Sequence, residues 1–450
     1  MKSLDQIAAG LQGYDPQAMT CDDVHHFVHQ LVTPVTQTVE LPLLRTLGKV
    51  LASDVESPLD VPPHDNSAMD GYAFAGAQLA PKGTPLVLRV VGTALAGKAW
   101  SGTVATGECV KIMTGAIMPS GLDTVVPQEL VTTSANSISI PVGVLAAGDN
   151  RRLRGEDLAR GRAALQKGEL LTPARLGLAA SLGLKTLTVF RPLRVAYFST
   201  GDEILSLGDA PREGAVFDSN RYTVFGLLTR LGCEVLDLGV VRDDPALLEA
   251  AFLDAADRAD AIITSGGVSV GEADFTKVLM QQLGDVAFWR IAMRPGRPMA
   301  VGRIFKAKSA HDARNTSVSS YENNSKLKDP GDCGAIVFGL PGNPVAVMVT
   351  FLAFVRPALL QMMGAKATDQ PLLQARSTET IRKKPGRTEY QRVWVSTAAD
   401  GRLEVCSTGN QGSGVLRSMA EANGLLVLGH TQGNVAVGDT VNVMMFDGAI

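Results

Sequence analysis

The chain has 450 residues, with 42 Lys or Arg against 45 Asp or Glu and a formal net charge of −3. This near balance gives no field that would favour nucleic acid or a membrane surface, and the length is typical of about two to four domains. The five cysteines form no CxxC pair, which argues against a zinc site or a disulfide framework, and no signal peptide or apolar run of membrane-span length is evident, so we expect a protein of the reducing cytoplasm.

The N-terminal part is predicted to become helical after a weakly patterned start. Residues 1–19 show little periodicity, whereas Thr20 is a typical N-cap, and Asp22 and Asp23 suit the positive end of the helix that follows. Apolar residues spaced along 43–51 predict a second helix.

Three histidines lie on the first predicted helix. His25 and His29 are four residues apart, as paired metal ligands on one helix face often are, and His26 lies between them. No acidic or cysteine partner completes a site, so a solvated helix face is the favoured interpretation.

Residues 58–74 interrupt every periodic pattern with three prolines and a run of small polar residues. Asp65, Asn66, Ser67 and Asp70 are more polar groups than a simple connection needs. A cluster of turns that satisfies its own backbone is the alternative, but the density of oxygen atoms favours a functional loop.

The next segments predict a β-rich domain and a return to mixed structure. Short apolar runs between residues 84 and 147, separated by Gly and Pro, are typical of a small β-barrel or sandwich. A polar stretch with Asp157 follows, and Pro173 predicts a helix that ends before Gly183.

From Leu193 the sequence alternates between strands and helices, with helices predicted at about 221–231, 245–258, 274–283 and 344–362. This alternation predicts a doubly wound α/β domain with ligand groups beyond the carboxyl ends of its strands. Polar residues follow each predicted strand, and their convergence is a stronger signal than any single motif: Thr200 to Glu203, Asp243 and Asp244, Ser265 to Asp274, Arg294 to Arg297, and Leu340 to Pro344.

The most informative of these segments is the loop after the strand that begins at Ala261. Gly266 and Gly267 permit positive φ and a close approach of the backbone to a ligand, and free N–H groups there would favour a phosphate. Glu272 and Asp274 in the same loop indicate a bridging divalent cation. An ordinary glycine-rich turn is an equally weighted alternative for the loop taken alone.

The remaining segments complete the predicted domain division. Residues 306–333 are polar and are expected to form a disordered surface insertion. We predict a multidomain α/β plus β protein with four parts: an N-terminal linking α+β domain (20–62 and 148–190), an inserted β-rich domain (63–147), the α/β domain (191–364) and a small C-terminal β-barrel (371–450).

Six motifs occur along the chain in a characteristic order: DNSAMDGYAF, KIMTGAIMP, RRLRGEDL, FSTGDEIL, SGGVSVGEADF and GLPGNPV. In sequence and order they resemble the molybdopterin molybdenumtransferases, the MoeA family, which includes the E domains of gephyrin and plant Cnx1. The resemblance covers roughly residues 20–450. It implies that the α/β domain binds molybdopterin.

The resemblance also implies an activity and its partners. It implies insertion of molybdate into adenylylated molybdopterin, with Mg²⁺-dependent hydrolysis and release of AMP, by an elongated homodimer whose cleft uses both protomers. A molybdopterin adenylyltransferase and apo-molybdoenzymes are implied as further partners, with no role for nucleic acid or membrane.

Individual residues follow from the matched motifs. The catalytic residues implied are Asp70, Thr114, Asp157, Glu203, Asp243 and Asp274, of which Asp243 and Asp274 would hold the metal. The substrate-binding residues predicted are Ser265, Gly266, Gly267, Asp218, Asn220, Arg294, Arg297, Pro341, Gly342, Asn343 and Pro344. Asp70 and Asp157 are assigned to the partner protomer's cleft.

Two departures from the family pattern and two rival functions stand beside this interpretation. Arg294 and Arg297 replace the lysines of the family's KPGKP motif, and Ala346 replaces the serine of its GNPVS motif. The rivals are a molybdopterin adenylyltransferase or nucleotide pyrophosphatase on the same α/β domain, and a gephyrin-like scaffold. The DNSAMDGYAF loop argues against the first, and the near-complete set of acids argues that catalysis is retained.

Overall fold

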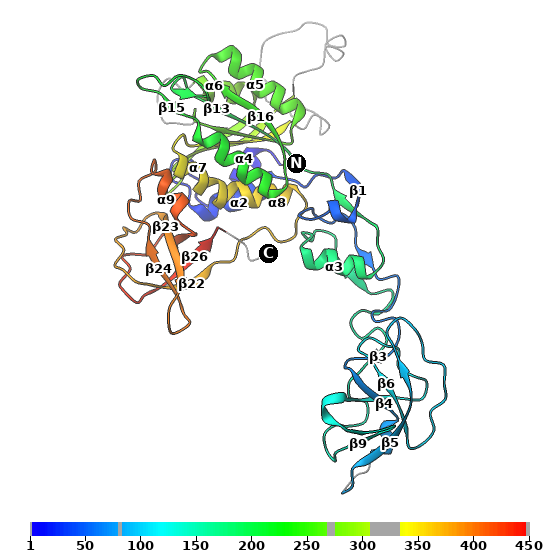
Figure 1. Ribbon diagram of the computed structural model, residues 1–450. Helices are drawn as coiled ribbons and strands as arrows, with labels where there is room; N and C mark the ends of the chain where they lie inside the picture. Colours follow the sequence, from blue (N-terminus) through cyan, green and yellow to red (C-terminus); the bar gives the residue numbers. More distant parts are fainter. Residues whose placement is uncertain (1, 80–82, 268–274, 307–333, 447–450) are drawn as a thin grey trace, which may run out of the picture.

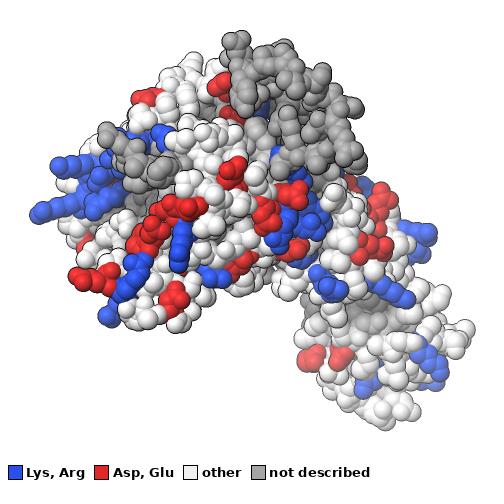
Figure 2. All heavy atoms as spheres, turned by 90° about the horizontal axis from the view of Figure 1, so that it is seen from above, with Lys and Arg blue, Asp and Glu red and all other residues white. Residues whose placement is uncertain are grey.

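The computed structural model describes residues 2–79, 83–267, 275–306 and 334–446. Figure 1 shows an α/β domain above a C-terminal barrel, and a β-rich domain held at a distance by a narrow linking region. Acidic and basic side chains are interspersed over the face seen in Figure 2. This distribution agrees with the near-zero net charge of the sequence.

The α/β domain is built on one six-stranded sheet. Its first four strands are parallel and β20 runs antiparallel to both of its neighbours, in the order β16 (Glu234–Val241), β13 (Arg194–Thr200), β17 (Ala261–Ser265), β21 (Ala335–Leu340), β20 (Pro298–Ile304) and β18 (Gly284–Arg290). The helices are α4 (Ser219–Leu231), α5 (Pro245–Arg258), α6 (Phe275–Leu283), and α7 (Pro344–Thr350) joined to α8 (Arg356–Met362) by a π-helical turn (Phe351–Val355). The predicted doubly wound fold is confirmed.

Alternate residues of each central strand pack on opposite faces of this sheet, as the two-residue period of a strand requires. Val195 and Tyr197 of β13 face the core under α4, α7 and α8, whereas Ala196 and Phe198 face the core under α5 and α6. The predicted helices begin at clear signals. Asp244, for example, caps α5 by accepting from the amide of Ala246 at 2.9 Å.

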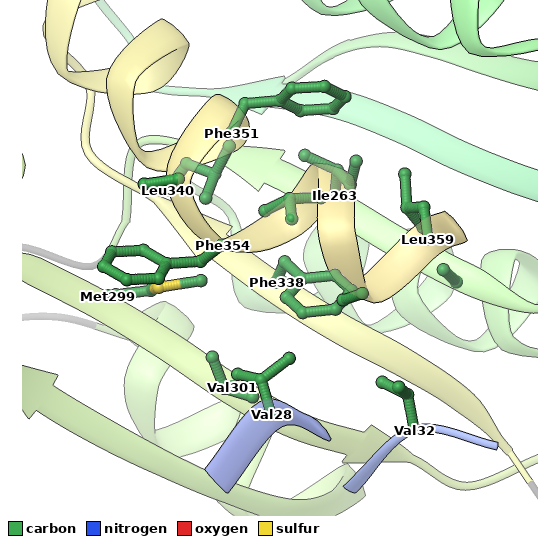
Figure 3. Packing of buried hydrophobic residues seen from close by; sticks show 14 of the residues in the cluster. Val28, Val32, Ile263, Met299, Val301, Phe338, Leu340, Phe351, Phe354 and Leu359 are labelled. Carbon is green, nitrogen blue, oxygen red and sulfur yellow. The ribbon is translucent and has the colours of Figure 1, made fainter. Parts of the chain in front are cut away.

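The N-terminal segment packs into the α/β domain. Helix α1 (Leu4–Ala9) begins at a capping box on Ser3, and helix α2 (Cys21–Leu31) begins at Thr20 as predicted. Figure 3 shows Val28 and Val32 of this segment beside the sheet residues Val301 and Phe338. The weak pattern of residues 1–19 therefore concealed a helix, and α2 lies in the core of the α/β domain although its residues fall in the linking range of the sequence division. The domain boundaries otherwise remain predictions.

The linking region is built from short paired strands and one helix. These are β1 (Thr38–Pro42) with β12 (Thr186–Phe190), β2 (Val55–Glu56) with β11 (Ala163–Leu165), β3 (Asn66–Ser67) with β10 (Arg151–Arg152), and α3 (Pro173–Ser181). The helix predicted at 43–51 is wrong. Only a 3₁₀ turn, η1 (Leu43–Arg45), forms, because Gly48 turns the chain at φ +72° and Val50 and Leu51 enter β-bridges.

The β-rich domain contains one six-stranded sheet with apolar clusters on both faces. Its order is β7 (Thr124–Pro127), β4 (Gly71–Phe74), β6 (Glu108–Ile112), β5 (Leu86–Ala94), β9 (Ser137–Ile140) and β8 (Thr132–Ser134), with 3₁₀ turns η2 (Gly76–Gln78) and η3 (Gln128–Leu130). The predicted β-rich character is confirmed, but the described strands pair as one sheet whose end strands β7 and β8 do not pair with each other, and not as the barrel or sandwich that was expected. Strand β4 lies within the segment that was interpreted as a loop. It was missed because its four residues are too few to show a periodic pattern.

The C-terminal domain is a closed five-stranded barrel, as predicted. Strand β23 pairs with both β24 and β25, which closes the ring. The strands are β22 (Leu373–Ser377), β23 (Thr388–Thr397), β24 (Leu403–Ser407), β25 (Gly424–Leu428) and β26 (Thr440–Met445), with α9 (Leu416–Glu421) beside them. A short strand of the α/β region, β19 (Met293–Arg294), adds to β23 and joins the two domains. A second short pair, β14 (Ile204–Leu205) and β15 (Val216–Phe217), precedes α4.

One helical segment corrects an expectation from the sequence. Residues Pro344–Met362 form a 19-residue helix of mean hydropathy 1.8, which by length and composition alone is enough to cross a membrane. In the structure 72% of the 18-residue window with this hydropathy is buried, and Figure 3 shows Phe354 of this helix beside Met299 of β20. An apolar run of span length therefore exists, and here it packs as the core helix of the α/β domain.

Candidate active site

A cavity of about 1160 Å³ opens at the carboxyl ends of β13, β17 and β21, between the α/β domain and the barrel. Its position is the one expected for ligands in a doubly wound sheet. Every substrate-binding residue predicted from the sequence lines it, together with two of the predicted acids: Ser265, Gly266, Gly267, Asp218, Asn220, Arg294, Arg297, Pro341, Gly342, Asn343, Pro344, Glu203 and Asp243.

The paired glycines are required by the backbone and by their neighbours. Gly266 and Gly267 have φ of +94° and +63°, a region that side chains rarely adopt. A Cβ on Gly266 would lie 2.3 Å from the carbonyl oxygen of Thr200, and a Cβ on Gly267 would lie 2.7 Å from Oγ1 of Thr276. The loop therefore follows the cavity wall closely. Residues 268–274, including Glu272 and Asp274, lie outside the described residues.

Three buried hydroxyls lie under the glycine loop. Tyr197 Oη is 2.6 Å from Ser265 Oγ and 2.9 Å from Ser199 Oγ, and both serines line the cavity. Burial raises the pKa of the Tyr197 phenol well above its ordinary value, so it stays protonated. The network fixes the ends of β13 and β17 relative to each other.

Asp218 and Asn220 connect the start of α4 to the cavity. Asp218 caps α4 by accepting from the amide of Arg221 at 3.0 Å, and Asn220 Nδ2 donates to the carbonyl of Gly342 at 2.7 Å. Among the described residues, the second carboxylate oxygen of Asp218 and the amide oxygen of Asn220 are buried without a hydrogen-bond partner. Each residue thus makes one hydrogen bond within the fold and keeps one side-chain oxygen that can accept another.

The acidic residues at the cavity come from two strand ends. The Thr200 hydroxyl donates to Oδ1 of Asp243, and the Asp243 amide donates to Oδ1 of Asp202 at 3.4 Å. Within the described ranges, no group of three or more His, Cys, Asp or Glu is arranged to hold a metal, the three histidines of α2 included. The described lining of the cavity offers three carboxylates, those of Glu203, Asp218 and Asp243, of which Asp218 also caps α4.

Arginines from two domains line one wall of the cavity. The pairing of β19 with β23 places Arg294 opposite Glu389 of the barrel, and Arg387 from the same barrel segment also lines the cavity. Arg387 is held by Glu389, with Nε 2.8 Å from Oε1. Among the described residues, Arg294 and Arg297 have no such carboxylate partner, so their charge is available to an anion.

Sequence reasoning missed the contribution of the barrel. Arg387, Gln411, Gly412, Ser413, Gly414 and Leu416 line the cavity. The available signal was the glycine-rich run TGNQGSG at 408–414, which is more than a barrel turn needs.

Three predicted catalytic residues do not reach the cavity in this chain. In the β-rich domain, Thr114 donates from its amide and its hydroxyl to Oδ1 of Asp70, at 2.7 and 2.8 Å. These bonds, the backbone bond first, lower the pKa of Asp70, so it stays ionised. Asp157 lies in the linking region, where its amide donates to the carbonyl of Val61 at 3.1 Å. None of the three lines the cavity, and Figure 1 places the β-rich domain far from it.

Known proteins match this chain along most of its length. Residues 19–183 match the MoeA N-terminal region (domain I and II), residues 196–361 a probable molybdopterin binding domain, and residues 374–446 the MoeA C-terminal region (domain IV). The molybdopterin molybdenumtransferase of Haemophilus influenzae is 38% identical over 93% of this chain and 96% of its own length. That of Nostoc sp. is 34% identical over 85% of this chain and 82% of its own length.

A solved structure gives the same result for the fold. The molybdopterin biosynthesis MoeA protein from Pyrococcus horikosii superimposes with a TM-score of 0.67 at 28% identity, covering 96% of this chain and 100% of that one. The domain matches, the relatives and the shared architecture all indicate the same family. The chain belongs to the MoeA family of molybdopterin molybdenumtransferases.

Proposed function

We propose that this protein inserts molybdate into adenylylated molybdopterin, with hydrolysis of the phosphoanhydride and release of AMP. The observation that carries the proposal is the cavity between the α/β domain and the barrel, which combines the glycine loop of β17 with Arg294, Arg297 and Arg387. A substrate with phosphate groups and an oxyanion as co-substrate both need such donors. The names of the relatives support the same assignment.

The two departures from the family motifs are compatible with this role. Arg294 and Arg297 present planar forks that bind an oxyanion with two hydrogen bonds, where lysine would act as a point charge. Ala346 lines the cavity in place of the family's serine, and Ser413 of the barrel brings a serine to the same cavity. We therefore expect oxyanion binding to be retained with altered geometry.

Mg²⁺ fits the described residues as the metal of this reaction. It prefers oxygen ligands and keeps several waters, so one or two carboxylates are enough to hold it. Asp243 and Glu203 would supply them, with the hydroxyl of Thr200 fixing the orientation of Asp243. Asp274 is the further ligand that the sequence suggests. When bound, the ion neutralises charge on the phosphates as the anhydride breaks.

The proposal includes a homodimer in which the β-rich domain of one protomer completes the cavity of the other. Large apolar side chains are exposed on β15 and α4, next to the cavity: Val216 at 57%, Phe217 at 44%, Tyr222 at 49% and Phe225 at 45%. Tyr222 and Phe225 share one helix face. A monomer rarely leaves such a patch in water, and a second copy would cover it. We place this dimer in the cytoplasm. It would receive its substrate from a molybdopterin adenylyltransferase and pass its product to the apo-molybdoenzymes.

The test is AMP release by the full chain from adenylylated molybdopterin. We expect release to require both Mg²⁺ and molybdate. An adenylyltransferase or nucleotide pyrophosphatase would act without molybdate, and a scaffold without activity would release no AMP.

A matched pair of variants makes this test specific to the cavity. Asp243→Asn removes the charge of a proposed metal ligand, and we expect AMP release to fall about a hundredfold or more. Asp237→Asn changes a carboxylate of β16, the strand that ends just before Asp243. Asp237 pairs with Arg221 and does not line the cavity. This control should keep near wild-type activity, and equal losses in both variants would contradict a metal role for Asp243.

A further inference from the structure

Most of the barrel residues that line the cavity belong to one loop, residues 409–414. Gln411, Gly412, Ser413 and Gly414 line the cavity. The amide of Val345, in the first turn of α7, donates to the carbonyl of Ser413 at 3.1 Å. Because Pro344, the residue before Val345, also lines the cavity, a shift of the loop would disturb the barrel side and the α7 side of the cavity at once.

Arg392 of β23 holds this loop from inside the barrel. Its side chain is fully buried, and its Nη2 donates to the carbonyls of Asn410 at 3.1 Å and Gly412 at 2.9 Å. Nη1 donates to the carbonyl of Gln411 at 3.2 Å, and Nε to Oγ of Ser418 at 3.0 Å. The planar guanidinium thus binds three successive carbonyls, which a single ammonium group cannot reproduce.

Gln411 makes further hydrogen bonds between the loop and Arg392. The Gln411 side chain accepts from the amide of Arg392 at 2.8 Å and donates to its carbonyl at 3.0 Å. Gln411 is therefore bound to Arg392 by its backbone and by both ends of its side-chain amide. These bonds leave the loop little freedom to change its conformation.

The chemistry around Arg392 is poorly explained by stability alone. Its acceptors are all neutral, and within the described part of the chain it has no carboxylate partner. Burial, and then repulsion by Arg294, lower the pKa of its guanidinium to about 10. A buried cation without a counter-ion costs folding free energy. Its hydrogen bonds to the 409–414 loop offset part of that cost, and the loop that they hold lines the cavity.

We infer that Arg392 is a positioning residue for the cavity: it fixes the 409–414 loop against the first turn of α7 and so sets the affinity for the oxyanion without touching it. This inference rests on the proposed function, because molybdate is the oxyanion in question. It assigns the barrel a role in substrate binding through an arginine that lies outside the cavity lining.

The test compares two buried cations of the same barrel. Arg392→Lys keeps the charge and loses most of the hydrogen bonds, and we expect the molybdate Kd, measured calorimetrically on the full chain, to rise about tenfold. Lys383 is the matched control. It is buried, donates to the carbonyl of Gln432 at 2.7 Å, and holds a segment that does not line the cavity. Lys383→Met should lower Tm and leave the Kd unchanged.

Amide exchange supplies a readout that is independent of ligand. Arg392→Lys should speed exchange at Val345 and in the 409–414 loop, and Lys383→Met should not. Equal exchange and equal Kd in the two variants would overturn the inference. If Arg392→Lys does not fold, Ser418→Ala removes one acceptor of the guanidinium and should raise the Kd about threefold. An unchanged Kd there overturns the inference as well. A wild-type chain that binds no molybdate would refute the proposed function, and the exchange comparison would still decide whether Arg392 positions the loop.

Discussion

The α/β domain and the β-rich domain handle their polar residues in opposite ways. In the α/β domain, groups from three strand ends and from the barrel converge on one cavity, because parallel strands bring their carboxyl ends to one edge of the sheet. In the β-rich domain, Asp70 and Thr114 are hydrogen-bonded to each other and do not line that cavity. One chain therefore gathers groups of the α/β domain and the barrel at one cavity and leaves Asp70 and Thr114 at a distance from it.

Complementation between two inactive variants tests this division most directly. Asp70→Ala removes the acid of the β-rich domain, Asp243→Ala removes an acid of the cavity, and we expect each homodimer to be inactive in AMP release. After subunit exchange, a heterodimer has one cavity that lacks both acids and one that keeps both. It should regain about half of the wild-type activity per dimer, by symmetry alone.

The control for complementation combines variants from the same domain. Asp243→Ala exchanged with Glu203→Ala leaves both cavities damaged, since both residues line the same cavity. No activity should return from that pair. If mass measurement confirms exchange and the Asp70 and Asp243 pair also stays inactive, both domains act within one chain and the shared site is wrong.

Much of the cavity could be predicted from the sequence because its groups follow a rule of topology. Each polar run after a strand of the alternating pattern, from Thr200 to Pro344, was expected at the same edge, and each run contributes residues to the cavity lining. Asp202 and Asp244 of these runs do not line the cavity, and Asp244 caps α5 instead. Gly266 and Gly267 were expected to allow positive φ and a close approach of the backbone, and their φ values and steric contacts confirm that side chains would not fit. Such predictions need only element order and not the packing of distant parts.

The missed features depend on tertiary contacts that no local pattern encodes. Arg387 and Ser413 reach the cavity because β19 pairs with β23, a contact between two domains. The false helix at 43–51 had a helical spacing of apolar residues, but Leu44 is 90% exposed and Leu51 is buried against β12. Helix α1 is only six residues long and is stabilised by packing of Leu4 and Ile7, so its periodicity was too short to read.

A carboxylate of the β-rich domain gives a smaller, local prediction. Asp123 Oδ1 accepts from the amide of Gly76 at 2.7 Å and from Oγ1 of Thr124 at 2.9 Å, and the bond from Gly76 is the main cause of its lowered pKa. Asp123→Asn weakens these charge-assisted bonds. We expect about 1 kcal/mol less stability of this domain at neutral pH, and no change in the molybdate Kd of the cavity.

The sign of the pH dependence follows from the lowered pKa. The carboxylate of Asp123 contributes stability above its unfolded value of 3.8, and the contribution is lost as pH falls through the lower folded value. Urea denaturation, with amide exchange reporting on the β-rich domain, should therefore separate wild type from Asp123→Asn at pH 7 and not in strong acid. A difference that grows on acidification would contradict this role, and a changed Kd would show that the two domains are coupled within one chain.

The smallest effect is expected from the polar segment between β20 and β21. Residues 307–333 lie outside the described residues, but their flanks are fixed: Ile304 pairs with Ala335 across the two antiparallel strands. A turn of about four Gly and Ser residues is long enough to join adjacent antiparallel strands. Replacing the segment by such a turn also shortens a loop, which favours folding by roughly 2 kcal/mol or less. We expect Tm to stay the same or to rise by no more than about 4 °C, with AMP release unchanged. Loss of the dimer or of activity in this variant would show that the segment takes part in assembly or in the site, and the comparison between the α/β domain and the remote β-rich domain would then have to include it.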